Sequence, residues 1–220
     1  MGAPSALLPF CFLNAPSRFH ASYITLPAIG QTMPSPESPE SLLIRKTGGV
    51  SKADHLLEEM SSELGLVGFP GSVLAAIALL RMGVDASTLS RALSWQEFED
   101  FTAALLGANG YTVSVNIVIT KPRRQIDIFA RSSTLALCVD CKHWTRSSNA
   151  GALEKLADEQ TERSVLYKKK MGLKLPVVPL LVTLGEPATR RAGGVPVVPV
   201  WALRSFLNEV NPFDQDLRVV

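Results

Sequence analysis

The pattern of apolar and polar positions divides the chain into a helical first part and a mixed second part. Apolar residues recur at helical spacing within residues 51–93, where Pro70-Gly71 and Gly83 interrupt the pattern. From Tyr111 onwards, short apolar and β-branched runs end at turn-forming residues, which is typical of strands. We therefore expect helices within residues 51–93, followed by three strands near residues 111–119, 125–130 and 134–142.

The second part continues with a long helical pattern and two further strands. We expect a helix over about 150–170, strands over 177–184 and 195–200, and a last helix over 203–210. With an amphipathic segment at 94–108, the element order becomes α-βββ-α-β-β-α. This order predicts an α/β fold in which a mixed central sheet is flanked by helices.

Composition adds domain boundaries to this pattern. Residues 1–45 are rich in Pro, Ser and Ala and lack periodicity, so we predict a flexible, disordered leader there, with Met33 as an alternative start of translation. A helical N-terminal module is expected over 46–92, an α/β domain over 93–210, and a C-terminal tail over 211–220. The chain of 220 residues, 46% of them apolar, is long enough to bury a sizeable core.

Charged residues interrupt two of the predicted strands. Asp127 lies in an apolar run, and Asp140 and Lys142 lie in the next run. Because side chains alternate faces along a strand, Asp140 and Lys142 share one face. Charges inside apolar strands are costly unless they are paired or bind a metal. The pattern therefore indicates a functional site, although Asp140 and Lys142 taken alone are equally well explained as a structural ion pair.

The amphipathic segment before these strands supplies a third acidic residue. Its apolar stripe contains Trp95, Phe98, Thr102, Leu105 and Leu106. Ser94 and Glu97 match a capping box, which gives Glu97 a structural role at the start of the helix. Glu99 lies on the edge of the stripe, so we expect it to be the acid that faces the sheet.

In this order the motifs resemble a known catalytic core. Phe98-Glu99 lies on a helix, Gly110-Tyr111-Thr112-Val113 opens a strand, and Ile126-Asp127 precedes Val139-Asp140-Cys141-Lys142-His143-Trp144. The set resembles the PD-(D/E)xK nuclease superfamily, in particular the Mrr-like restriction endonucleases and the archaeal Holliday-junction resolvases. The resemblance covers about residues 93–210. The sequence departs from the usual motif at Ile126, where the family often has proline.

The resemblance implies a restriction-endonuclease-like fold and a metal-dependent DNA endonuclease of the restriction, junction-resolving or repair type. It implies that Asp127 and Asp140 bind Mg²⁺ or Mn²⁺, and that Glu99 acts as a further ligand or through a water. Lys142 would orient the attacking water and stabilise developing charge. The family often places a glutamine in the next helix, which makes Gln160 a catalytic candidate. Gln160 is equally well explained as a hydrogen-bonded core amide.

The charge distribution favours DNA as the partner. Residues 91–220 hold 17 Lys and Arg against 13 Asp and Glu, whereas residues 1–90 carry a net charge of −2. Basic clusters of this kind contact phosphates without sequence preference, although lysines at the end of a helix also stabilise the helix dipole. The sequence leaves the substrate form and the oligomeric state open, a homodimer being one option. The candidate DNA-binding residues are Arg123, Arg124, His143, Arg146, Lys168, Lys169 and Lys170.

Two other functions fit parts of the sequence. A silent nucleic-acid-binding module could use the same fold without cleaving its ligand. A thiol-redox protein could use Cys138 and Cys141, but residues three apart on a strand point to opposite faces, so the thiols would diverge. Three cysteines, an odd number, favour a reducing, cytoplasmic compartment. No apolar run is long enough to predict a membrane span.

Overall fold

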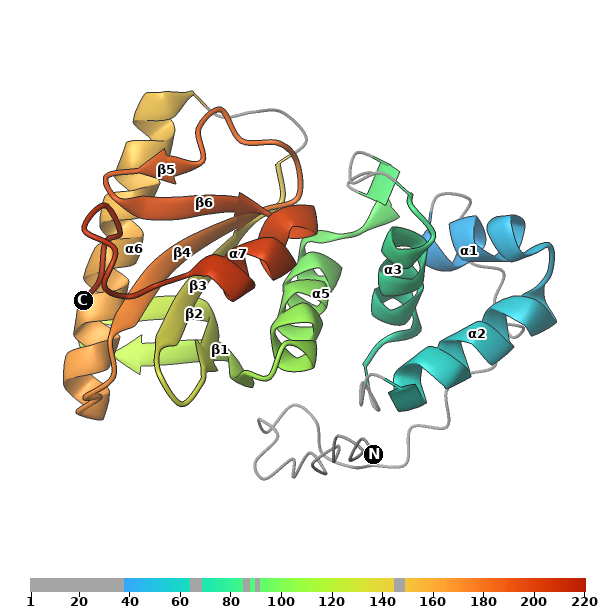
Figure 1. Ribbon diagram of the computed structural model, residues 1–220, viewed down its shortest axis with the longest axis horizontal. Helices are drawn as coiled ribbons and strands as arrows, with labels where there is room; N and C mark the ends of the chain where they lie inside the picture. The colour runs from blue at the N-terminus through green and yellow to red at the C-terminus, as the bar shows by residue number, and fades with distance from the viewer. Residues whose placement is uncertain (1–37, 64–68, 85–87, 90–91, 145–148) are drawn as a thin grey trace, which may run out of the picture.

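A computed structural model describes residues 38–63, 69–84, 88–89, 92–144 and 149–220. In this structure a helical module precedes an α/β domain, and both contribute to one continuous hydrophobic core (Figure 1). No helix in the described ranges is long and apolar enough to cross a membrane.

The helical module consists of α1 (Pro39–Thr47), α2 (Val50–Glu63) and α3 (Gly71–Arg81). Helix α3 is buried from Ser72 to Leu79 and contacts α1, α2 and the first helix of the α/β domain. Because α3 is apolar around its whole circumference, it lies in the centre of the module.

The prediction of a disordered leader over 1–45 is wrong for its last residues, because helix α1 begins at Pro39. The Ser38 hydroxyl caps the helix by accepting a hydrogen bond from the Ser41 amide, and Pro39 stands at the first helical position. Leu43 is fully buried in the core. The serine and proline that suggested disorder here, Ser38 and Pro39, instead cap and begin a helix. The rest of the leader lies outside the described residues.

The sheet has six strands in the order β1-β2-β3-β4-β6-β5. Strands β1 to β3 pair in antiparallel fashion, β3, β4 and β6 are parallel, and β5 is antiparallel to β6. This confirms the predicted mixed α/β fold and the order of its elements; only the two-residue strand β5 was not predicted. The strands are β1 (Thr112–Thr120), β2 (Arg123–Arg131), β3 (Ala136–Lys142), β4 (Val177–Thr183), β5 (Arg191–Ala192) and β6 (Val195–Pro199).

Helices cover both faces of the sheet. Helix α5 (Trp95–Ala108) packs on β1, β2 and β3, and α6 (Ala150–Met171) packs on the other face (Figure 1). The short 3-10 helix η1 (Val200–Ala202) and α7 (Leu203–Glu209) follow β6 and share the core on the α5 side. All seven residues of the central strand β4 are buried, as expected for a parallel strand covered on both faces.

The sequence of α5 fixes where it starts and which face it buries. The Ser94 hydroxyl accepts a hydrogen bond from the Glu97 amide, and the Glu97 carboxylate accepts one from the Ser94 amide, so the predicted capping box is present. Phe98 and Phe101 are fully buried in the hydrophobic core that α5 shares with α3 and the sheet. Trp95 is 56% exposed, so its predicted place on the buried stripe is wrong.

The β1–β2 hairpin changes its packing partner halfway along. Asn116 has φ of +52°, a left-handed conformation that asparagine tolerates better than most residues. Before Asn116, the apolar residues of β1 pack with the core on the α5 side; beyond it, Ile117 and Ile119 pack with Tyr167 of α6. In the hairpin register Asn116 lies opposite Asp127, between the pairs Val115–Ile128 and Ile117–Ile126. Asp127 therefore lies where the hairpin twists.

The predicted C-terminal tail packs against the sheet rather than extending away from it. The main chain of Val220 exchanges two hydrogen bonds with Val177 at the start of β4, at 2.9 and 3.0 Å. The Arg218 amide donates to the Gly194 carbonyl at 2.8 Å. The last residues therefore extend the hydrogen-bonded structure beside β4 and β6.

Replacing the capping serine tests this account of α5. Ser94→Ala removes the acceptor for the Glu97 amide and should lower the free energy of unfolding by about 1 kcal/mol. Ser62→Ala, at an exposed position of α2, serves as the control and should change it by less than about 0.5 kcal/mol. The measurement is equilibrium urea denaturation. Equal effects of the two substitutions would show that the capping box does not stabilise α5.

Candidate active site

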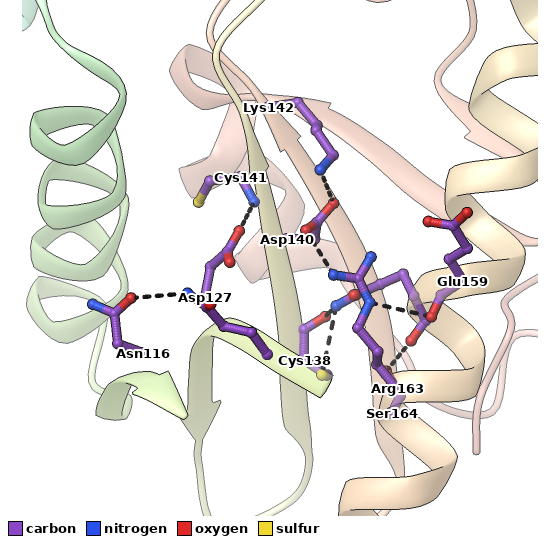
Figure 2. A network of polar contacts seen from close by, with 11 residues as sticks. Asn116, Asp127, Cys138, Asp140, Cys141, Lys142, Glu159, Arg163 and Ser164 are labelled. Atoms are coloured by element: carbon purple, nitrogen blue, oxygen red, sulfur yellow. Dashed lines mark hydrogen bonds and ion pairs between the residues drawn. The ribbon is translucent and has the colours of Figure 1, made fainter. Parts of the chain in front are cut away.

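The C-terminal end of β3 carries a buried ion pair. The Asp140 side chain is 3% exposed, and the Lys142 ammonium lies 2.7 Å from its Oδ2. Both side chains extend on the same side of β3, as the alternation of a strand predicts (Figure 2). At this distance the ammonium is the cationic partner of Oδ2. A further ligand of Oδ2 must therefore share this oxygen with Lys142 or displace it.

Arg163 of α6 contacts the other oxygen of Asp140. Its guanidinium donates to Asp140 Oδ1 at 3.1 Å, and its Nε donates to the carbonyl of Glu159 in its own helix at 3.2 Å (Figure 2). The Arg163 side chain is 15% exposed. Our sequence analysis did not single out Arg163. The available signal was its place on α6 three residues after Gln160, one helical turn further along the face that meets the sheet.

Asp127 reaches β3 from the twisted part of the hairpin. Its Oδ2 accepts a hydrogen bond from the Cys141 amide at 2.9 Å, next to the last β2–β3 pair, Ile128–Val139 (Figure 2). Burial raises the pKa of the Asp127 carboxyl, and the negative charge of Asp140 raises it further. The Cys141 amide, Lys142 and Arg163 oppose this rise. The two carboxylates are therefore close enough to repel one another.

Glu99 lies on α5, the helix that covers the face opposite α6. Its residue is 9% exposed, which agrees with the expectation that it faces the sheet. Burial is the main cause of the raised pKa of the Cys141 thiol, and the charges of Asp127 and Glu99 raise it further. No group of three or more His, Cys, Asp or Glu side chains within the described part of the chain could hold a metal ion. Glu99 therefore does not join Asp127 and Asp140 in one cluster of ligands in this structure.

Gln160 is fully buried between α6 and β3. Its amide nitrogen donates to the Cys138 carbonyl at 2.7 Å and lies 3.5 Å from the Cys138 sulfur. Its Oε1 is buried and accepts no hydrogen bond from any described residue. In this structure Gln160 fixes α6 to the strand that carries Asp140.

The predicted DNA-binding residues come from separate elements. Arg123 and Arg124 are the exposed first residues of β2, on the part of the hairpin beyond Asn116 that packs with Tyr167 of α6. Helix α6 runs back to the start of β4, which pairs with the start of β3, so its last lysines lie at the end of the sheet opposite Lys142. Lysines 169 and 170 are exposed there.

Two of the candidate DNA-binding side chains have partners within the protein. The Lys168 ammonium donates to the Val220 main-chain oxygen at 2.7 Å. The Nε2 atom of His143 lies 2.7 Å from the Leu93 carbonyl, and its ring packs edge-on against Phe98. Arg146 lies outside the described residues.

The two cysteines of β3 lie in different environments. Cys138 packs with the core on the α6 side, and Cys141 packs with the core on the α5 side. Burial raises the pKa of Cys138 to about 12 and that of Cys141 well above its ordinary value. Because the thiolate is the reactive form, neither thiol is poised for redox chemistry near neutral pH. The divergence predicted from the strand pattern is present, and the thiol-redox hypothesis loses its chemical basis.

The donor set at the end of β3 suits a hard divalent cation. Asp127 and Asp140 provide carboxylate oxygens, the ligand type that Mg²⁺ and Mn²⁺ prefer. The negative charge of Asp140 raises the pKa of Asp127, and a cation between the two carboxylates would relieve this repulsion. The thiols of Cys138 and Cys141 are protonated and provide no competing soft ligand.

Comparison with known proteins agrees with this geometry. Residues 90–169 match the restriction endonuclease family model of the Mrr catalytic domain. The matched stretch extends from just before α5 to the last turns of α6, and it includes Glu99, Asp127, Asp140 and Lys142. The match and the mixed sheet are consistent with an Mrr-like catalytic domain of the PD-(D/E)xK type and with a restriction-endonuclease-like fold. No curated protein and no solved structure matches the chain.

The raised pKa of Asp127 predicts a defined pH dependence of stability. A folded-state pKa above the unfolded value means that the folded protein keeps the Asp127 proton to higher pH. Protonated Asp127 therefore contributes to the free energy of unfolding at acidic pH, and this contribution is lost as the pH rises through the raised pKa. Asp127→Asn is neutral at every pH and can still accept from the Cys141 amide. Its melting temperature relative to wild type should therefore increase from about pH 4 to about pH 7.

Thermal unfolding in buffers without divalent cations measures this difference. Asp158→Asn removes a carboxylate from an exposed position of α6 and is the matched control. If the Asp127→Asn variant loses stability relative to wild type as the pH rises, Asp127 is stabilised as an anion and the electrostatic account of the pair is wrong.

Proposed function

We propose that the Mrr-like domain is a metal-dependent endonuclease that hydrolyses phosphodiester bonds in DNA. The observation that carries the proposal is the Asp140–Lys142 pair at the end of β3, next to Asp127, inside the segment that matches the restriction endonuclease family. A buried carboxylate with a cationic partner and a second carboxylate beside it is the minimum that such chemistry requires.

The carboxylates would hold the metal. Asp127 and Asp140 are the proposed ligands of Mg²⁺ or Mn²⁺. When bound, such a cation lowers the pKa of a coordinated water and offsets negative charge on the phosphate. Asp127 is held in place by the Cys141 amide, so its orientation does not depend on the metal. Glu99, on the α5 side of the same strand, is proposed to act through water rather than as a direct ligand.

Lys142 is proposed to stabilise charge that develops on the attacked phosphate and to orient the attacking water. Its side chain is 22% exposed, whereas that of Asp140 is 3% exposed, so the ammonium lies at the boundary between the buried carboxylate and solvent. From that position it can leave Asp140 Oδ2 and approach a phosphate. Gln160, bonded to the Cys138 carbonyl, is proposed to position β3 and thereby Asp140, without contacting the substrate.

DNA is the proposed substrate, with the cleaved phosphate at the end of β3 that carries Asp140 and Lys142. Arg123 and Arg124 are exposed on the hairpin that packs with Tyr167 of α6, and they are proposed to contact phosphates away from the cleaved bond. Lys169 and Lys170 are exposed near the end of α6 and would contact DNA that runs along that helix. The form of the DNA, any homodimer and the cytoplasmic location remain predictions from the sequence.

A silent nucleic-acid-binding module is the second candidate function. The observation in its favour is that Asp140 is paired with two cations, Lys142 and Arg163, which neutralise it without a metal. Such a module would bind DNA through the same basic residues and would cleave nothing. Cleavage and binding must therefore be measured side by side.

Substitution of the lysine separates these two functions. Lys142→Ala should lower the single-turnover cleavage rate by roughly a hundred- to thousand-fold, because it removes a positive donor aimed at developing charge. DNA affinity should change little, because one lysine is a small part of the total phosphate attraction. The measurement pairs single-turnover cleavage with a binding curve on the same substrate.

The double substitution Arg123→Ala, Arg124→Ala is the complementary control. It should weaken DNA binding and reduce its dependence on salt, while leaving the rate of the bound complex nearly unchanged. Wild-type protein that binds DNA but cleaves none with Mg²⁺ or Mn²⁺ would support the silent module instead.

Metal binding can be tested without DNA. Mn²⁺ at about 100 times its Kd should stabilise the wild type by about 2.7 kcal/mol, because it binds the folded state alone. Asp140→Asn should unfold at a lower temperature than wild type, since Lys142 and Arg163 lose their charged partner, and it should no longer respond to Mn²⁺. An unchanged response of this variant would exclude Asp140 as a ligand. Thermal melts with and without Mn²⁺ make the comparison.

A further inference from the structure

We propose that Arg163 is a positioning residue that competes with the divalent cation for Asp140 and thereby sets the metal affinity of the site. The inference rests on the proposed function, because it assumes that Asp140 is a metal ligand. It assigns a role to a residue of α6 that lies outside the set of motifs by which the domain resembles its superfamily.

The contacts of Asp140 leave no oxygen free of cations. Arg163 contacts Oδ1 at 3.1 Å, and Lys142 lies 2.7 Å from Oδ2. With 3% of its side chain exposed, Asp140 has almost no contact with solvent. A cation that binds either oxygen must therefore share Asp140 with at least one positive side chain already beside it (Figure 2).

Arg163 cannot leave the site as easily as Lys142. Its Nε is bonded to the Glu159 carbonyl of α6, its side chain is 15% exposed, and α6 is fixed to β3 by Gln160. The guanidinium therefore remains near a bound cation after it gives up Oδ1. A fixed positive charge within a few ångströms of a divalent cation opposes binding, and burial makes this repulsion stronger than it would be in water.

Calorimetric titration of Mn²⁺ at about pH 8, well above the ordinary range of carboxyl groups, tests the inference without an activity assay. Arg163→Gln should bind Mn²⁺ with a Kd at least about tenfold lower than the wild type, because the repulsive charge is gone. Arg163→Lys keeps the charge and should remain within about threefold of the wild type. Lys155→Gln removes one charge from an exposed position of α6 and should not change the Kd.

The stability of the same variants provides a second readout. Without metal, Arg163→Gln should melt below the wild type, because Asp140 loses a buried partner; with saturating Mn²⁺, its melting temperature should rise by more than that of the wild type. A residue with a merely structural role would lower the melting temperature but would not tighten metal binding. Arg163→Met, with an apolar side chain of similar length, should show the same lower Kd and decides the question if the glutamine variant does not fold.

The outcomes separate this inference from the proposed function. A Kd of Arg163→Gln equal to or higher than that of the wild type, together with loss of binding in Asp140→Asn, overturns the competition and leaves the metal site intact. No binding of Mn²⁺ to the wild type or to the Arg163 variants overturns both the metal site and the competition.

Discussion

The site depends on one constraint, which is the charge balance of a carboxylate buried at the end of a sheet strand. Asp140 is almost completely shielded from water, and an isolated charge in that position would be prohibitively costly. Lys142 from the same strand and Arg163 from α6 compensate it. Asp127 adds a second negative charge, so two carboxylates face two cations; burial is the main cause of the rise in the pKa of Asp127, and the charge of Asp140 adds to it. The proposed divalent cation would therefore bind in competition with Lys142 and Arg163.

The rest of the domain provides the surroundings that this balance requires. Parallel strands β3 and β4 and the two covering helices bury Asp140, and the Gln160 amide ties α6 to β3 so that Arg163 meets the carboxylate. The β1–β2 hairpin twists at Asn116, opposite Asp127. There the Asp127 carboxylate accepts a hydrogen bond from the Cys141 main-chain amide of β3. Arg123 and Arg124 are exposed on the same hairpin, beyond this twist, and provide positive charge that can attract DNA.

Much of this arrangement could be predicted from local patterns, because strand alternation and helical spacing depend on neighbouring residues alone. They correctly predicted the mixed sheet, the capping box at Ser94, the shared face of Asp140 and Lys142, and the divergence of Cys138 and Cys141. Arg163 was missed because its partner is 23 residues away and in another element. Helix α1 was missed because a Ser-Pro start resembles a disordered segment, and the internal contacts of His143 and Lys168 depend on how distant segments meet.

Cleavage of a panel of linear, branched, methylated and single-stranded DNA substrates, with Mg²⁺ or Mn²⁺ and with a chelator, tests the central claim most directly. The account predicts that at least one substrate is cut by the wild type, that the chelator stops the reaction, and that Asp140→Asn is inactive on that substrate. Binding of the panel without cleavage under any of these conditions would contradict it, and so would cleavage that persists in the Asp140→Asn variant.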